Sequence, residues 1–284
     1  MKATYLASAK PLKSSQFWLL GIAAGLIAIH LTLAYRTDKI NLLGNSILFW
    51  LAVSSLVWNK RDRLSLESGI FASSVGTAIL ALVLLKTMSL PDGYFLLLLP
   101  FISGVALALL ASGFKGLTQY WQELTSLFFL GVPQILLSSL VDPSVLTAKF
   151  ATFTLWYSGF NVSRSGVNIH LPNGQVEVYP GCSGIESITQ LLSLAVLFLT
   201  MFSIKGVKKI FVPIVAVLLA FVVNGIRVAL MAVLVASSKQ EAFNYWHTGD
   251  GSMIFSMIAV LLFGLFCLFL LQQDKPENQA TGES

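Results

Sequence analysis

The chain has few charged residues, few cysteines and few histidines. Charged side chains make up 11% of its 284 residues and apolar ones 56%, a balance that excludes an ordinary soluble domain and is typical of a membrane protein. With two cysteines and three histidines, we find no metal motif such as His-Glu-x-x-His, no phosphate loop and no serine-protease spacing. The sequence therefore predicts neither a metal site nor a cofactor.

Apolar runs cover most of the chain. Each is long enough, at about 1.5 Å per residue, to cross a hydrocarbon core of about 30 Å. We predict an all-α polytopic membrane protein with about eight transmembrane helices, near residues 17–35, 41–58, 69–90, 94–111, 122–141, 184–203, 210–236 and 252–271. Residues 1–271 then form one membrane domain, and 272–284 a short polar cytoplasmic tail.

The lysines and arginines indicate the orientation. With a cytoplasmic N-terminus, most of the 18 basic residues fall on the cytoplasmic side, including the cluster Lys205, Lys208 and Lys209. The net positive charge therefore reflects membrane topology, and we find no nucleic-acid-binding footprint. We expect both termini of this cell (inner) membrane protein in the cytoplasm, and Cys182 and His247 on the extracytoplasmic side.

The longest connection between predicted spans, residues 142–182, has structure of its own. Thr147 to Phe160 carries aromatic residues at spacings that suit a helix at the lipid headgroups. Two alternating runs, 167–171 and 175–179, flank an Asn-Gly pair, which is a strong hairpin signal. We predict an interfacial helix and a small extracytoplasmic β-hairpin flap before the sixth transmembrane helix. The alternative is a plain linker.

Cys182 lies at the start of a predicted helix, in Pro180-Gly-Cys-Ser-Gly-Ile-Glu186. Ser183 and Glu186 have the spacing of a capping box, so we expect Ser183 to cap the helix. Free N–H groups and the positive end of the helix dipole would stabilise a thiolate there. Cys182 is a candidate nucleophile or, alternatively, a packing residue, as we expect for Cys267; a structural disulfide is not expected.

Arg227 ends the motif Asn224-Gly-Ile-Arg227, roughly 13 Å from the outer end of its predicted helix. A charge at that depth favours the bundle interior or a wet cavity, and its fork of donors suits a carboxylate or an oxyanion. Asn224 lies one turn earlier on the same face. Asn224 and Glu186 are candidate substrate-binding residues. The alternative is a structural ion pair between Arg227 and Glu186.

His247 immediately precedes the last predicted span and is the best candidate for a general base. His170, on the predicted flap, is the reserve, whereas His30 lies inside the first span with no nearby partner. Asp250 is a candidate for orienting His247. A cysteine, a histidine and an arginine on one face suit acyl transfer, with thiolate attack on a carbonyl and stabilisation of the oxyanion.

At these residues the chain resembles the exosortase/archaeosortase family of multi-pass membrane transpeptidases. The resemblance rests on Pro180-Gly-Cys182-Ser-Gly-Ile185, Asn224-Gly-Ile-Arg227 and His247 before the final helix, in the family's order. The setting Trp246-His247-Thr248-Gly249 is most similar to the cyanobacterial branch, the cyanoexosortases.

The resemblance implies a membrane-tethered, exported substrate protein with a C-terminal signal of the PEP-CTERM type: a Pro-Glu-Pro-type motif, a transmembrane helix and a basic cluster. Cys182 would be the nucleophile of this cysteine protease and form a thioester, and His247 would be the acid and base. Arg227 would position the substrate or stabilise the oxyanion. The acyl group would pass to an acceptor amine, whose identity the sequence does not give, or to water.

Three other functions fit the same residues. A transporter could use Arg227 and Glu186 as an intramembrane ion pair. A membrane acyltransferase could use the outward-facing His247 without a thiol. A non-catalytic assembly partner would tolerate substitution of Cys182, Arg227 and His247 alike.

Overall fold

A computed structural model describes residues 14–37, 40–89, 93–247 and 251–273. Each predicted span coincides with a long helix, within a few residues at each end. These helices are α1 (Ser14–Arg36), α2 (Ile40–Lys60), α3 (Ile70–Met88), α4 (Gly93–Gly116), α5 (Trp121–Leu140), α7 (Ile185–Met201), α8 (Lys208–Ala236) and α10 (Gly251–Gln273). Two shorter helices complete the α structure of the described chain, α6 (Ser144–Tyr157) and α9 (Gln240–His247).

Six segments of the described chain are long and apolar enough to cross a membrane. One of them, Gly93–Leu140, is 48 residues long and contains both α4 and α5, which meet at the 3₁₀ turn η2 (Leu117–Tyr120). Helix α7 is apolar but has only 17 residues. The all-α polytopic membrane fold is thus confirmed, whereas the number of crossings stays a prediction.

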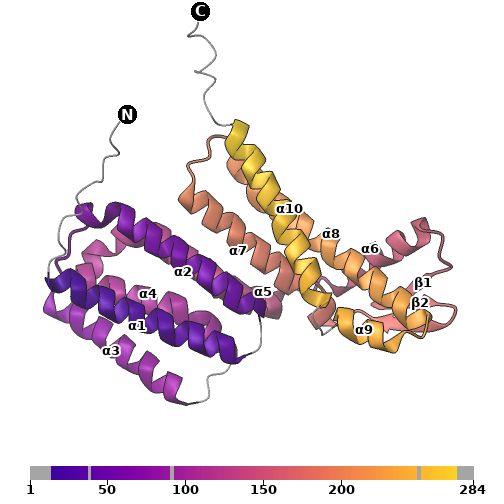
Figure 1. The fold of residues 1–284 in the computed structure, drawn as a ribbon, viewed down its shortest axis with the longest axis horizontal. Helices are drawn as coiled ribbons and strands as arrows, with labels where there is room; N and C mark the ends of the chain where they lie inside the picture. Colours follow the sequence, from indigo (N-terminus) through magenta and orange to yellow (C-terminus); the bar gives the residue numbers. More distant parts are fainter. Residues whose placement is uncertain (1–13, 38–39, 90–92, 248–250, 274–284) are drawn as a thin grey trace, which may run out of the picture.

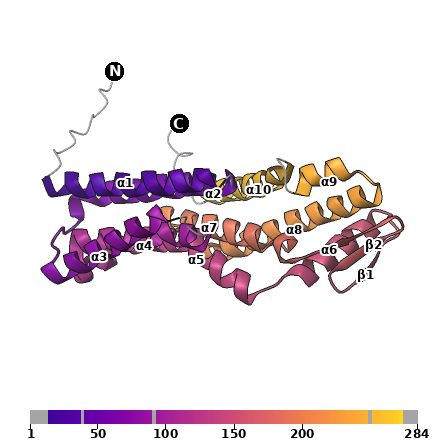
Figure 2. The same ribbon diagram turned by 90° about the horizontal axis from the view of Figure 1, so that it is seen from below.

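The helices form an elongated bundle of two layers. Figure 1 shows α1 to α4 at one end of the molecule, α7, α8 and α10 in the middle, and α6, α9 and a small sheet at the other end. In Figure 2 one layer contains α1, α2, α10 and α9, and the other contains α3, α4, α5, α7 and α8. Helix α8, with 29 residues, reaches from the middle of the bundle into the region of the sheet.

Hydrogen bonds show which helix ends lie together. Lys60 Nζ at the end of α2 pairs with Glu123 Oε2 at the start of α5, at 2.6 Å. Gln122 Nε2 donates to the carbonyl of Thr200, near the end of α7, at 2.9 Å. The end of α2, the start of α5 and the end of α7 therefore lie on one side of the bundle, which is the side that we predict to be cytoplasmic.

A three-stranded antiparallel sheet follows α6, in the order β1 (Ser163–Ser165), β2 (Asn168–Leu171) and β3 (Gly174–Glu177). The predicted hairpin is β2 and β3, and Leu171 pairs with Gly174 across a two-residue turn. Strand β1, which the sequence analysis did not predict, adds to the outer side of β2. With three residues, Ser-Arg-Ser, this strand is too short and too polar to show the alternation of apolar and polar residues that predicts a strand.

Helix α6 is the predicted interfacial helix. One face, with Ala148, Ala151 and Leu155, is buried in a cluster with the sheet and α8. On the other face Phe153 and Trp156 are exposed, as a helix at a membrane surface requires. Its position at the lipid headgroups stays a prediction.

Matched serine-to-cysteine substitutions test the orientation. We expect Ser163→Cys, on β1, to react with a membrane-impermeant maleimide in intact cells, because the basic cluster after α7 predicts that the opposite end of the bundle is cytoplasmic. Ser203→Cys, beside that cluster, should react only after permeabilisation. Both side chains are exposed, and both variants carry Cys182→Ser and Cys267→Ser to remove background. The reverse labelling pattern would mean an inverted protein.

Candidate functional site

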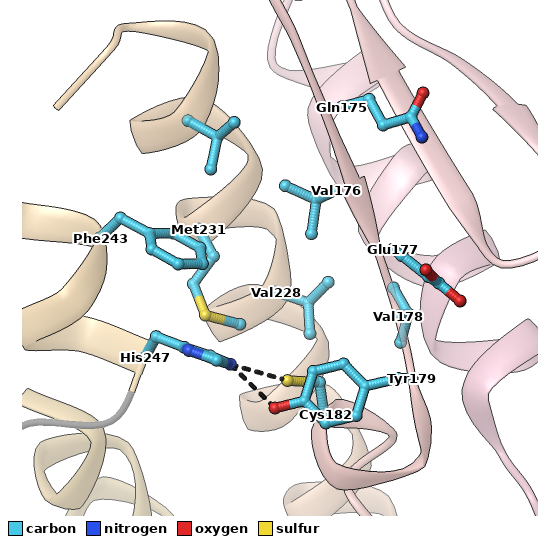
Figure 3. Close-up of a pocket in the computed structure, with 11 residues that line it drawn as sticks. Gln175, Val176, Glu177, Val178, Tyr179, Cys182, Val228, Met231, Phe243 and His247 are labelled. Carbon is cyan, nitrogen blue, oxygen red and sulfur yellow. Dashed lines mark hydrogen bonds between the residues drawn. The ribbon is translucent and has the colours of Figure 1, made fainter. Parts of the chain in front are cut away.

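Cys182 is the last residue of the 3₁₀ turn η3 (Pro180–Cys182), which leads from the sheet into α7. Its thiol is buried, and its Sγ atom lies 3.3 Å from Nε2 of His247. A thiol and an imidazole within hydrogen-bonding distance can act as nucleophile and general base. Figure 3 shows both side chains at the end of a pocket.

His247 ends α9, and its ring is held by neighbouring aromatic residues. Phe243, one turn earlier, stacks on the imidazole with centroids 5.0 Å apart and planes at 24°. Burial and then the positive charge of Arg227 lower the pKa of His247 below its usual 6.5. At neutral pH the ring is therefore mostly uncharged, which is the form that can accept a proton from a thiol.

Arg227, on α8, holds the end of α9 by its backbone. Its Nη2 donates to the carbonyl of His247 at 2.7 Å, and its Nε donates to the carbonyl of Trp246 at 3.4 Å. A cation at these terminal carbonyls also complements the negative end of the helix. The Arg227 side chain thus positions His247 by binding main-chain carbonyls at the end of α9.

Asn224, one turn before Arg227 on α8, holds Cys182 in the same way. Its Nδ2 donates to the carbonyl of Cys182 at 3.0 Å, and the residue is 4% exposed. From α6, Thr147 Oγ1 donates to the next carbonyl, that of Ser183, at 2.7 Å. Two buried side chains, one from α8 and one from α6, therefore fix the backbone around the thiol.

The predicted capping box is wrong. The N-cap of α7 is Gly184, in the left-handed conformation at φ 91°. Ser183 Oγ donates to the carbonyl of Pro180 at 2.6 Å and accepts only a long hydrogen bond, 3.5 Å, from the N–H of Ile185, the first residue of α7. Only glycine adopts this conformation without strain. A Cβ atom at position 184 would also lie 2.6 Å from Asn224 Nδ2, so the turn needs glycine in order to fit against α8.

Tyr179 belongs to the site, although the sequence analysis treated it only as the end of a strand. Its hydroxyl lies 3.2 Å from His247 Nε2. Its hydrogen bond with Cys182 and, to a smaller extent, its burial raise the pKa of Tyr179 above its usual 10. Its position directly before the Pro180-Gly-Cys182 motif was the available signal, but only the fold of η3 turns the hydroxyl back toward the sulfur.

A pocket of about 180 Å³ opens beside the thiol. One wall is β3 with Val178 and Tyr179, and the others are one face of α8 and the residues Phe243 and His247 of α9. Apart from Gln175, Glu177 and the side chains of Tyr179, Cys182 and His247, its lining is apolar, namely Val176, Val178, Val228, Met231, Val235 and Phe243. Such a pocket suits a small apolar group next to a reacting carbonyl.

The profile of the transmembrane exosortase family matches residues 38–264, which contain every residue of this site. The chain belongs to the transmembrane exosortase family. The assignment to its cyanobacterial branch stays a prediction.

A curated relative of this exosortase family member is a probable archaeosortase E of Methanocaldococcus jannaschii. The two are 33% identical over 96 residues, which is 34% of this chain and 50% of the relative. The chain thus spans about half the length of the curated relative that it matches. No solved structure matches the chain.

In the described chain, none of the remaining candidate residues hydrogen-bonds to Cys182 or to the ring of His247. Glu186 is exposed, and among the described residues it forms no ion pair with Arg227, which corrects the proposed buried pair. His170 lies in β2 opposite Gln175. His30 was predicted to lack a partner, yet its Nδ1 accepts a hydrogen bond from Trp50 Nε1 at 2.9 Å.

Two other residues complete the predicted set. Cys267 is buried in the apolar core around α10, which agrees with a packing role. Asp250, the candidate for orienting His247, lies outside the described residues.

Substitution of Arg227 should change the protonation of His247. Without the positive charge, the imidazolium is penalised less, so we expect Arg227→Gln to raise the pKa of His247 toward 6.5. Arg227→Lys keeps the charge and should leave this pKa closer to that of the wild type. Carbon-13 NMR of labelled histidine, with the signal assigned by His247→Gln, measures both midpoints. An unchanged midpoint in Arg227→Gln would contradict the electrostatic coupling.

Gly184→Ala should destabilise the protein more than the matched substitution Gly159→Ala. Both glycines have positive φ, at 91° and 86°, so each variant should lose about 1–2 kcal/mol of unfolding free energy from backbone strain. Gly184→Ala adds a clash with Asn224, whereas position 159 has open space, and we expect a further loss of about 1–3 kcal/mol. Thermal unfolding in detergent compares the two; equal losses would refute the close contact with Asn224.

Proposed function

We propose that this exosortase is a membrane-embedded cysteine transpeptidase that processes the C-terminal sorting signal of exported proteins. The observation that carries the proposal is the distance of 3.3 Å between Cys182 Sγ and His247 Nε2, in a chain that belongs to this family. The relative in Methanocaldococcus jannaschii, a probable archaeosortase by its name, is consistent with this class of enzyme.

In the first half-reaction, His247 Nε2 accepts the proton of the Cys182 thiol. The sulfur attacks the scissile carbonyl and forms a tetrahedral intermediate. When the C–N bond breaks, the imidazolium returns the proton to the leaving amine. Its lowered pKa favours that return. The products are a Cys182 thioester and the released C-terminal segment.

In the second half-reaction, an acceptor amine attacks the thioester carbonyl. Neutral His247 takes the proton of the amine, the C–S bond breaks, and the proton restores the thiol. Water in place of the amine would give hydrolysis. The hydrogen bonds from Asn224 and Arg227 to the carbonyls of Cys182 and His247 keep the pair aligned through both steps.

The substrates in this proposal are exported proteins with a C-terminal signal of the PEP-CTERM type. Their transmembrane helix would lie against the bundle, which places the scissile bond at the extracytoplasmic end, near Cys182. The apolar pocket along β3 would accept a side chain next to that bond. We assign no function in transport, because Arg227 bonds the backbone of α9 and forms no ion pair with Glu186 in the described chain.

A pair of cysteine-to-alanine variants tests the proposal. A tagged reporter with a Pro-Glu-Pro-type motif, a transmembrane helix and a basic cluster is co-expressed with each variant, and its length is followed by immunoblot. We expect Cys182→Ala to abolish the shortened product, because no other group supplies the nucleophile. The matched control Cys267→Ala should retain cleavage, because Cys267 is a buried residue of α10.

Further variants extend the same assay. Cys182→Ser should be nearly inactive, since a hydroxyl is a much weaker nucleophile at neutral pH, and His247→Ala should lose about 10²–10⁴-fold in rate. Cleavage that persists in Cys182→Ala would overturn the cysteine mechanism and favour a non-thiol acyltransferase.

A further inference from the structure

The main-chain N–H groups of Cys182 and Ser183 are already hydrogen-bonded and do not offer themselves to the negative charge of a tetrahedral intermediate. Acyl-transfer enzymes commonly bind this oxyanion with main-chain N–H groups near the nucleophile. Here the N–H of Cys182 donates to the carbonyl of Tyr179 at 2.8 Å, and that of Ser183 donates to the carbonyl of Pro180 at 3.2 Å. Both groups stabilise the turn η3 itself, so neither is available to bind the oxyanion.

Arg227 has a structural role that competes with oxyanion binding. Its Nη2 and Nε donate to the carbonyls of His247 and Trp246, and these bonds hold the base in place. A guanidinium that turned toward the substrate would give up its contact with the end of α9. The oxyanion would be better stabilised by a hydrogen-bond donor that reaches it without disturbing His247.

Tyr179 has such a donor. Its hydroxyl lies 3.2 Å from His247 Nε2, the nitrogen that is itself 3.3 Å from Cys182 Sγ. Figure 3 shows the phenol oxygen and the sulfur side by side, both facing the imidazole. A carbonyl attacked by the sulfur would therefore lie within reach of this hydroxyl.

We propose that Tyr179 is a further catalytic residue, whose hydroxyl donates a hydrogen bond to the oxyanion formed when Cys182 attacks a carbonyl. The inference rests on the proposed acyl-transfer function. The pKa of Tyr179 is raised, so the phenol stays protonated through the neutral range. The environment of the site thus preserves the donor.

The step balances as follows. The thiol proton moves to His247 Nε2, the Sγ–C bond forms, and the C=O electron pair moves onto oxygen, where it accepts the hydrogen bond of Tyr179. Collapse of the intermediate re-forms the C=O bond and breaks the bond to the leaving group, which takes the proton from His247. Tyr179 keeps its own proton throughout.

Two small probes separate this role from a structural one. The ester p-nitrophenyl acetate acylates a thiol through an oxyanion and releases p-nitrophenolate, whereas iodoacetamide alkylates a thiol by direct displacement of iodide without an oxyanion. In the purified full-length protein, we expect Tyr179→Phe to slow acylation of Cys182 by about tenfold or more. Alkylation, followed across pH, should stay within about twofold of the wild type.

The matched control is Tyr157→Phe, which removes a hydroxyl from the exposed face of α6 and should change neither rate. Cys182→Ala gives the background for both probes. Acylation and alkylation that fall together in Tyr179→Phe would assign Tyr179 to positioning the thiol and overturn the inference. Two other results would also overturn the inference. One is acylation of Tyr179→Phe at the wild-type rate, and the other is acylation of the wild type no faster than that of Cys182→Ala.

The same variants in the reporter assay distinguish this inference from the proposed function. Cleavage that requires Cys182 but is unchanged in Tyr179→Phe would refute the role of Tyr179 alone. Cleavage that does not require Cys182 would refute the transpeptidase, while the ratio of the two probe rates would still decide whether Tyr179 assists acyl transfer at this thiol.

Discussion

Two hydrogen bonds from one helix bring Cys182 and His247 together. Asn224 and Arg227 lie three residues apart on α8, and each donates to a backbone carbonyl, that of Cys182 and that of His247. Cys182 lies between the sheet and α7, and His247 lies at the end of α9, so the two residues belong to different elements. The separation of sulfur and imidazole therefore depends on α8. Because both bonds go to main-chain atoms, the thiol and the ring remain available for chemistry.

The surroundings of α8 strengthen this arrangement. Asn224 is buried, and a hydrogen bond removed from water is stronger and more costly to break. Gly184 lets the turn before α7 approach Asn224 closely, and Thr147 holds the next carbonyl from α6. The sheet packs over this region through buried residues such as Ile169 and Val178. The region that connects α5 to α7 thus forms part of the site.

Several parts of the fold were predictable because their signals are local. Long apolar runs predict the helices, and Asn-Gly between alternating residues predicts the hairpin of β2 and β3. The exceptions are features whose stability comes from tertiary contacts. Strand β1 has no apolar alternation and exists because β2 offers it an edge. The N-cap of α7 is Gly184 rather than Ser183, and it must be a glycine because Asn224 on α8 leaves no room for a Cβ atom there.

By itself, the sequence determined the membrane character of the chain and the residues able to do chemistry, namely a thiol at a helix start, a histidine before the last span and an arginine inside another. Hydrophobicity and residue type are properties of the chain, so they can be read without coordinates. Only the tertiary structure decided that the side chains of Arg227 and Asn224 donate to main-chain carbonyls and that Glu186 is exposed. It also brought the hydroxyl of Tyr179 to His247. These are contacts between residues distant in sequence, and their partners depend on how the helices pack.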